Sequence, residues 1–508
     1  MAEPYYKESK GGLTPFAKIL IGLIIVAVVG FAAWKYLPDD GAGGVSIGGF
    51  GGGDLKVHLV TYSGMAPGPY FNNGMTPNPE SRYVKDYGLK VRFVVMDVIP
   101  DAIQAWKANK LDIIVLTVDS YPVGLQELLP LNPRIFYLTD KSQGADVIVA
   151  AANVRSVEDL AGRRVGFVPG TPSQWFLLNI LKAANMTLKD VQSIEFMEVP
   201  QAFKAFETGQ LDAVVGWSPD DIAVRERVPG AHILKSTKES SEMLFGIMFA
   251  KQELLEKRRK EVQSFVEGWM KAAAELNVNT AAREKAARIM TAGYSGTSPD
   301  YWLETFANVR FATYGDNLGF FGLNSSYKGV TAEMVYDEAS KVYAQLGMAS
   351  PNLPRWRSVS DASIVSSISL VGQEHLAQAP ASFAPPTPAM MTQEAVATKN
   401  IRVNYAFNSS ELEPLEKLKL KNEYGSIVAM NRNSRFRIIG HTDNVGDRDY
   451  NIRLSQRRAK AIVDFFVETY GLSPNQFVYS GKGPDEPVAT NATEEGRAMN
   501  RRAECSLL

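Results

Sequence analysis

Residues 440–466, GHTDNVGDRDYNIRLSQRRAKAIVDFF, decide the fold of the C-terminal part of the chain. They begin at the end of an apolar, strand-like run, and that run ends at Asp443. In the helix expected next, Leu454 and Ile462 belong to an apolar stripe at helical spacing, and Arg458 lies on that stripe, four residues from each. An inward-facing arginine needs a partner, because an unpaired buried charge is expensive. The segment therefore predicts a polar site between a strand end and a helix.

This segment closely resembles the OmpA-like peptidoglycan-binding family. It carries the family's TD, G, YN, LS and RA in order, GRAMNRRAE matches the closing signature, and the likeness covers about residues 399–508. The resemblance implies an α+β domain in which Asp443 and Arg458 bind the ammonium and carboxylate of a diaminopimelate side chain, with Asn451 and Arg501 as pocket neighbours. An acid suits an ammonium, and a planar guanidinium binds a carboxylate through two hydrogen bonds. The alternative is that Asp443 and Arg458 merely satisfy each other.

Composition restricts the remaining classes of function. A chain of 508 residues, 45% hydrophobic and 21% charged, predicts two or three globular domains. Its net charge of -1 gives no reason to expect nucleic acid as a partner. The single cysteine, Cys505, excludes an internal disulfide and a cysteine metal cluster, and the four histidines are scattered. We therefore expect no metal site, no cofactor and no catalytic residues, and predict a binding protein rather than an enzyme.

The N-terminal region reads as a membrane anchor. No residue between Lys18 and Lys35 is charged, so we predict a cytoplasmic segment at 1–16, a transmembrane helix at 17–37 and a glycine-rich linker at 38–53. Three lysines, the last of them Lys18, precede the uncharged stretch and two aspartates follow it, which predicts a single-pass inner-membrane protein with its bulk in the periplasm. The alternative is a cleaved signal peptide.

Residues 54–348 alternate short runs rich in Val, Ile and Phe with helical segments, as in LDIIVLTVDS and PSQWFLLNILKAANM. This alternation predicts an α/β fold with parallel or mixed sheets, split into two lobes. SVEDLAGRRVGFVPGTPSQWFLLNILKAANMTLKDV followed by VPQAFKAFETGQLDAVVGW resembles the second lobe of periplasmic solute-binding proteins of the nitrate/sulfonate/taurine ABC transporter class. The resemblance implies a type 2 periplasmic binding protein fold that closes around a small solute, with lobe crossings near 140–150 and 230–245.

Ligands of open α/β sheets bind beyond the carboxyl ends of strands, where helix N-termini offer free amides. Four loops are predicted there, and their candidate solute-binding residues are Tyr62, Ser63, Gly64, Thr117, Asp119, Thr171, Ser173, Gln174, Trp217 and Asp220. Taken singly, each residue has an ordinary alternative as a helix cap, a turn residue or core packing. Hydroxyls at a helix N-terminus suit an anion, whereas Trp217 and Tyr62 beside Asp119 and Asp220 suit a cationic amine, and a zwitterion satisfies both.

Residues 349–398 include AQAPASFAPPTPAMM and predict a semi-rigid linker to the C-terminal domain. The assembled prediction is an inner-membrane-anchored periplasmic protein that grips peptidoglycan and presents a small organic solute to a transporter or a signalling partner. The alternative is a structural tether in which the solute-binding fold docks a protein and takes no small ligand. A receptor should show a polar groove at the four loops, and a tether a groove filled by side chains.

Overall fold

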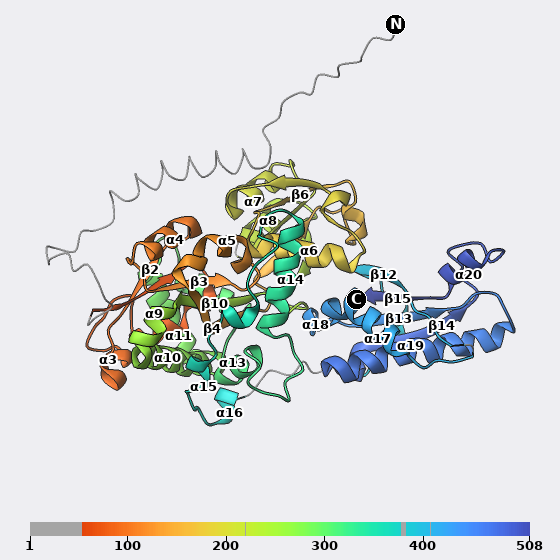
Figure 1. The fold of residues 1–508 in the computed structure, drawn as a ribbon. Coiled ribbons are helices and arrows are strands. Elements are labelled where there is room, and N and C mark those ends of the chain that lie inside the picture. Colours follow the sequence, from red (N-terminus) through yellow and green to blue (C-terminus); the bar gives the residue numbers. More distant parts are fainter. Residues whose placement is uncertain (1–52, 219, 377–382, 407) are drawn as a thin grey trace, which may run out of the picture.

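The computed structural model describes residues 53–508 except residues 219, 377–382 and 407 (Figure 1). The predicted membrane span and the glycine-rich segment up to residue 52 lie outside the described residues. Within the part of the chain that is described, no helix is both long and apolar enough to cross a membrane. Two α/β lobes are followed by a C-terminal α+β domain (Figure 1).

The first lobe is built on a six-stranded sheet of order β11-β4-β10-β3-β1-β2. Its strands are β1 (Leu55–Leu59), β2 (Val91–Val95), β3 (Ile113–Thr117), β4 (Pro133–Ser142), β10 (Phe245–Lys251) and β11 (Val309–Phe311). β1 is parallel to β2 and β3, whereas β10 is antiparallel to both β3 and β4. The carboxyl ends of β1, β2, β3 and β4 therefore meet at one edge of the sheet, where β10 begins.

The sheet of the first lobe is covered by helices whose apolar faces form its core. They are α2 (Pro67–Asn72), α3 (Arg82–Tyr87), α4 (Ile99–Lys107), α5 (Tyr121–Leu128), α9 (Gln252–Lys257), α10 (Arg259–Val278), α11 (Thr280–Gly293), α12 (Pro299–Phe306), α13 (Tyr314–Phe320) and α14 (Ala332–Gln345). On α10 the fully buried Trp269 meets the rings of Phe93 and Tyr137 edge-on, which joins this helix to the sheet.

The second lobe has a five-stranded sheet of order β7-β6-β8-β5-β9. Its elements are β5 (Asp146–Ala150), β6 (Arg164–Phe167), α6 (Pro172–Ala183), β7 (Gln192–Glu195), α7 (Val199–Glu207), β8 (Ala213–Trp217), α8 (Asp220–Arg227) and β9 (His232–Ser236). β6 is parallel to β7 and β8, and β5 is antiparallel to β8 and β9. β5 therefore begins at the edge where β6, β8 and β9 end. The chain crosses between the lobes from β4 to β5 and returns from β9 to β10.

The C-terminal domain has a four-stranded sheet of order β12-β15-β13-β14, with β13 and β14 parallel. Its strands are β12 (Ala397–Arg402), β13 (Phe436–His441), β14 (Phe477–Gly483) and β15 (Arg502–Leu507). Its helices are α17 (Pro414–Leu420), which runs through a π-helical turn (Lys421–Gly425) into α18 (Ser426–Met430), the long α19 (Arg448–Tyr470) and α20 (Glu494–Asn500). α19 packs against β13 and β14.

The predicted linker at 349–398 is wrong in its first part. The backbone N–H of Ile135 in β4 donates to the carbonyl of Val359, and Asp361 N–H donates back to the Ile135 carbonyl. Ile364 and Val365 of the short helix α15 (Ser363–Ser366) are fully buried in the first lobe. The apolar residues of this stretch are buried on the first lobe, so this segment extends the two-lobed domain beyond residue 348.

The C-terminal domain packs directly on the second lobe (Figure 1). Glu158 accepts a hydrogen bond of 2.7 Å from the backbone N–H of Thr398, where β12 begins. Next to the return crossing, Ser240 Oγ lies 2.5 Å from Asn431 Oδ1, and the Glu239 carbonyl accepts from the backbone N–H of Asn433. The end of α18 and the turn after it therefore rest on the segment that leads from β9 to β10.

Candidate functional site

Asp443 lies just beyond β13, two residues after His441, which lines a small cavity of the C-terminal domain. Its Oδ2 accepts a 2.6 Å hydrogen bond from Arg501 Nη1, and its Oδ1 accepts from the backbone N–H of Val445. Arg501 reaches Glu494 with its other terminal nitrogen, also at 2.6 Å. Asp443 is thus held by Arg501, and the alternative in which Asp443 and Arg458 satisfy each other is wrong.

Arg458 projects from α19 and is half-buried beside Tyr405. Its Nε donates a 3.0 Å hydrogen bond to the carbonyl of Ser409, and the guanidinium lies 4.6 Å from the centre of the Tyr405 ring. Burial lowers the pKa of Arg458, while Tyr405 and Asp443 act in the opposite direction. Among the described residues no carboxylate pairs with Arg458, and its two terminal nitrogens have no partner there. A planar guanidinium with both terminal nitrogens free can bind a carboxylate through two hydrogen bonds.

A small cavity beside Arg458 has a volume of ≈ 10 Å³, and its walls include Tyr405, His441, Arg458 and Arg501. Asn451 is buried and donates a 2.9 Å hydrogen bond to the Val445 carbonyl, so it holds the loop that carries Asp443 rather than lining the cavity. His441 Nε2 lies 3.3 Å from a carboxylate oxygen of Glu504. Across the residues that the structure describes, no three His, Cys, Asp or Glu side chains gather as a metal site.

The four predicted solute-binding loops lie at the edges of the two sheets that face each other. Tyr62, Ser63 and Gly64 follow β1, and Thr117 and Asp119 stand at the end of β3; both strands end at the same edge of the first lobe. Thr171, Ser173 and Gln174 lie between β6 and the first turn of α6, and Trp217 and Asp220 lie between β8 and α8. The strand directions thus bring the loops of each lobe to one edge.

Several of these side chains already have structural roles. Thr171 Oγ1 donates to the Val168 carbonyl at 2.7 Å, and Gln174 Oε1 accepts from the Gly170 backbone N–H at 2.7 Å, so both hold their own loop. Trp217 is half-buried against the core cluster around α7. Burial raises the pKa of Tyr301 in α12, and the charge of Asp220 raises it further. Asp220 therefore lies close to this helix of the first lobe.

Other predicted residues present buried polar atoms without partners. Asp119 and Ser173 are both fully buried, and Asp119 Oδ1 and Ser173 Oγ have no hydrogen-bond partner within the described chain. Asp119 Oδ2 accepts from Ser120 Oγ, which in turn accepts from Thr117 Oγ1 at 2.9 Å. Buried polar atoms are seldom left unpaired unless they serve a ligand, a water or an ion.

Two further acids, which the sequence analysis missed, lie at the first lobe crossing. Asp140 lies near the end of β4 and accepts a 2.6 Å hydrogen bond from Thr139 Oγ1, and Asp146 begins β5 and accepts one of 2.6 Å from Ser142 Oγ. Both are nearly fully buried. Their signal was the segment DKSQGAD, which has an acid at each end and falls where the chain was expected to cross between lobes.

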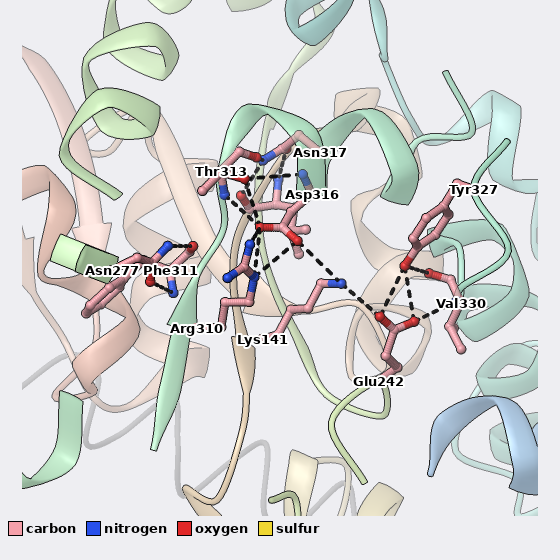
Figure 2. A network of polar contacts seen from close by, with 11 residues as sticks. Lys141, Glu242, Asn277, Arg310, Phe311, Thr313, Asp316, Asn317, Tyr327 and Val330 are labelled. Atoms are coloured by element: carbon pink, nitrogen blue, oxygen red, sulfur yellow. Dashed lines mark hydrogen bonds and ion pairs between the residues drawn. The ribbon is translucent and has the colours of Figure 1, made fainter. Parts of the chain in front are cut away.

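A buried ion network braces the same region on its other side (Figure 2). Lys141 pairs with Glu242 at 3.0 Å and with Asp316 at 3.7 Å, and Arg310 pairs with Asp316 at 2.9 Å. Glu242 also accepts from Tyr327 OH and from the Val330 backbone N–H. Burial opposes the charge of Lys141, but Glu242, Tyr327 and Asp316 outweigh it and raise its pKa. The network ties both lobe crossings to α13 and the segment before α14.

The fold consists of two α/β lobes joined to an α+β domain with an acid–arginine pair. The OmpA family model matches residues 404–501, and the model described as NMT1/THI5 like matches residues 79–279. A peptidoglycan-associated lipoprotein of Pseudomonas putida is 34% identical over 114 residues, covering 22% of this chain and 67% of that protein. Through its C-terminal domain the chain belongs to the OmpA family.

Two other relatives show how far the likeness extends. Outer membrane porin F of Pseudomonas aeruginosa is 35% identical over 131 residues, which are 24% of this chain and 37% of that protein, so the chain spans about a third of its length. The periplasmic aliphatic sulphonate binding protein SsuA of Escherichia coli is 18% identical, with a TM-score of 0.48, and the match covers 66% of this chain and 97% of that one.

Proposed function

We propose that this protein binds peptidoglycan through the pocket of Asp443 and Arg458, and a small organic solute between its two lobes. The observation that carries the first half is Arg458, whose terminal nitrogens are free in a half-buried position although its Nε is fixed. A diaminopimelate end carries one ammonium and one carboxylate. The carboxylate would take the free nitrogens of Arg458, and the ammonium would join Asp443.

Arg501 is assigned a supporting role in this pocket. In the structure it neutralises Asp443, and it also holds Glu494, so it joins the loop after β13 to α20. An incoming ammonium would share the Asp443 carboxylate with Arg501. Oδ2 of Asp443 accepts from Arg501, whereas Oδ1 accepts, within the described chain, from the backbone N–H of Val445 and can accept a further hydrogen bond. Asn451 acts through the loop that it holds. The printed name of the Pseudomonas putida relative supports peptidoglycan as the partner.

A pulldown on purified sacculi tests the wall-binding half. We expect the Asp443→Ala, Arg458→Ala double variant of the full chain to lose at least about 30-fold in affinity, because truncating one partner of a buried charged hydrogen bond costs about 2–5 kcal/mol. Arg453→Ala is the matched control, since Arg453 is an exposed arginine on the same helix, and its retention should stay unchanged. Undiminished retention of the double variant would remove the pocket assignment.

The solute-binding half is supported by the loops at which the two lobes meet. These loops end in buried polar side chains, two of them with unpaired atoms, rather than in an apolar plug. A tether whose fold only docks a protein has no need to bury such groups, because each costs free energy unless it is paired. We therefore favour a receptor that is immobilised on the wall and anchored in the inner membrane by residues 17–37. Its partner would be a transporter or a signalling protein of that membrane.

A further inference from the structure

Three buried carboxylates from both lobes lie close together where the lobes meet. Asp119 follows β3, Asp140 lies near the end of β4, and Asp146 begins β5 across the crossing. Burial raises the pKa of Asp146 most, and the charges of Asp119 and Asp140 raise it further. The three acids therefore form one cluster. We infer that the cleft receives a small organic cation, with an ammonium group among the carboxylates of Asp119, Asp140 and Asp146. This inference rests on the proposed solute-binding function.

No basic side chain neutralises the cluster. Within the described residues, none of the three acids forms an ion pair with a lysine, arginine or histidine. Lys141 follows Asp140 in β4, but it is bound to Glu242 and Asp316 in the network of Figure 2. Within the described chain the donors to the acids are neutral groups. They are Thr139 and Tyr62 for Asp140, Ser142 for Asp146, and Ser120, Thr117 and its own backbone N–H for Asp119. Buried charge without a counter-charge is costly, so each acid is either neutralised by a proton or paired with a positive charge from outside the chain.

The backbone around Asp140 leaves room for its carboxylate. A Cβ on Gly64, in the loop after β1, would lie 2.4 Å from the carboxyl carbon of Asp140, and a Cβ on Gly246 in β10 would lie 2.2 Å from its Oδ1. Both positions therefore require glycine if the acid is to keep its place. Gly64 and Gly246 thus leave space for the Asp140 carboxylate, which forms no ion pair with any described side chain.

Polar atoms of the cluster and of the residues around it also lack a partner within the described chain. Asp119 Oδ1 and Ser173 Oγ are unpaired and fully buried, and they come from opposite lobes. The hydroxyl of Tyr343 in α14 also lacks a partner within the described chain. Burial raises the pKa of Tyr343 most, and the charge of Asp119 raises it further, so Tyr343 lies close to Asp119. Its ring lies 6.2 Å from that of Trp175 in α6. An ammonium group donates up to three hydrogen bonds, and aromatic rings beside it favour a cation.

The protonation of the cluster supports the same class of ligand. Burial raises the pKa of Asp119 to about 7, that of Asp140 to about 6 and that of Asp146 to about 7. The other titratable groups that face them are Tyr62, Tyr137 and Tyr343, whose pKa values burial raises further above neutrality. Without a ligand the cluster therefore holds protons near pH 6.5, and a bound cation would displace them. Affinity for a cation should then rise from pH 5.5 to pH 8.

The test is a thermal shift of the full chain in mild detergent with compounds that differ in one charged group. The probes are ethylamine, putrescine and choline as cations, ethanesulfonate as an anion and taurine as a zwitterion, each against sodium chloride at equal ionic strength. We expect at least one of the amines to raise the melting temperature at pH 8 and ethanesulfonate to have no effect. The binding of that amine should release on the order of one proton at pH 6.5, measured by calorimetry in two buffers.

Variants assign the effect to the cluster. Asp119→Asn and Asp140→Asn should each weaken the amine by about 30-fold, and Asp86→Asn, an exposed acid on α3, should leave it unchanged. If ethanesulfonate stabilises the protein, or if taurine does so while none of the amines does, the cation inference is wrong and the proposed receptor function is retained. No stabilisation by any probe overturns both. If the Asn variants fail to fold, the proton release of the wild-type chain decides, and binding without proton release contradicts the inference.

Discussion

Replacing Gly481 by alanine is expected to destabilise the C-terminal domain by about 3 kcal/mol or more and to abolish retention on sacculi. Gly481 lies in β14 where α19 crosses it. A Cβ there would lie 2.3 Å from the backbone nitrogen of Gln456 and 2.5 Å from the carbonyl oxygen of Ile452. Backbone atoms cannot move aside as the end of a side chain can, so the helix must leave the sheet. That helix carries Arg458, and the wall-binding pocket would open with it.

Urea denaturation, followed by circular dichroism and by sacculus retention, measures this effect. Gly124→Ala is the matched control, because Gly124 lies within α5 and a Cβ there would meet no atom within 4 Å. That variant should be neutral or more stable by up to about 1 kcal/mol, since alanine restricts the unfolded chain. Equal unfolding midpoints for the two variants would show that α19 does not pack on β14 as closely as described here.

Glu242→Ala is expected to cost the solute-binding domain about 3–5 kcal/mol, the usual cost of removing one partner from a buried ion pair. The change leaves Lys141 in a buried position with only Asp316, at 3.7 Å. It also removes the acceptor for Tyr327 OH and for the Val330 backbone N–H. The lobe crossings would then lose their shared brace, which Figure 2 shows between β4, the segment before β10 and the segment before α14.

Two comparison variants isolate the buried charge. Glu127→Ala breaks the pair of Lys107 and Glu127, in which the glutamate side chain is 70% exposed, and should cost at most about 1 kcal/mol. The double variant Lys141→Met, Glu242→Leu should recover part of the loss, because apolar residues of similar volume replace buried ion pairs at little or no cost. Chemical denaturation at pH 7 measures all three, and a Glu242→Ala midpoint equal to that of Glu127→Ala would refute the role of the network.

Short-range patterns were enough to single out Asp443 and Arg458, the residues of the proposed wall-binding pocket. The apolar run that ends at Asp443 and the stripe through Arg458 are local signals, and in the structure Arg501 pairs with Asp443 and lines the same small cavity as Arg458. These local signals could not predict that Asp443 pairs with Arg501. Arg501 reaches Asp443 from a segment 58 residues further on, because β15 lies next to β13 in the sheet. Strand order depends on how whole elements pack, and residue spacing does not reveal it.

The same division applies to the cleft. The α/β alternation and the loops that follow β1, β3, β6 and β8 could be predicted from the sequence, because propensity and periodicity act over a few residues. Only the tertiary structure decided that Asp140 and Asp146 join Asp119, and that the C-terminal domain rests on the return crossing. These arrangements depend on β10 and β5 running antiparallel to their neighbours, which brings the starts of some strands to the ends of others. Contacts between distant segments, rather than local preference, set that direction.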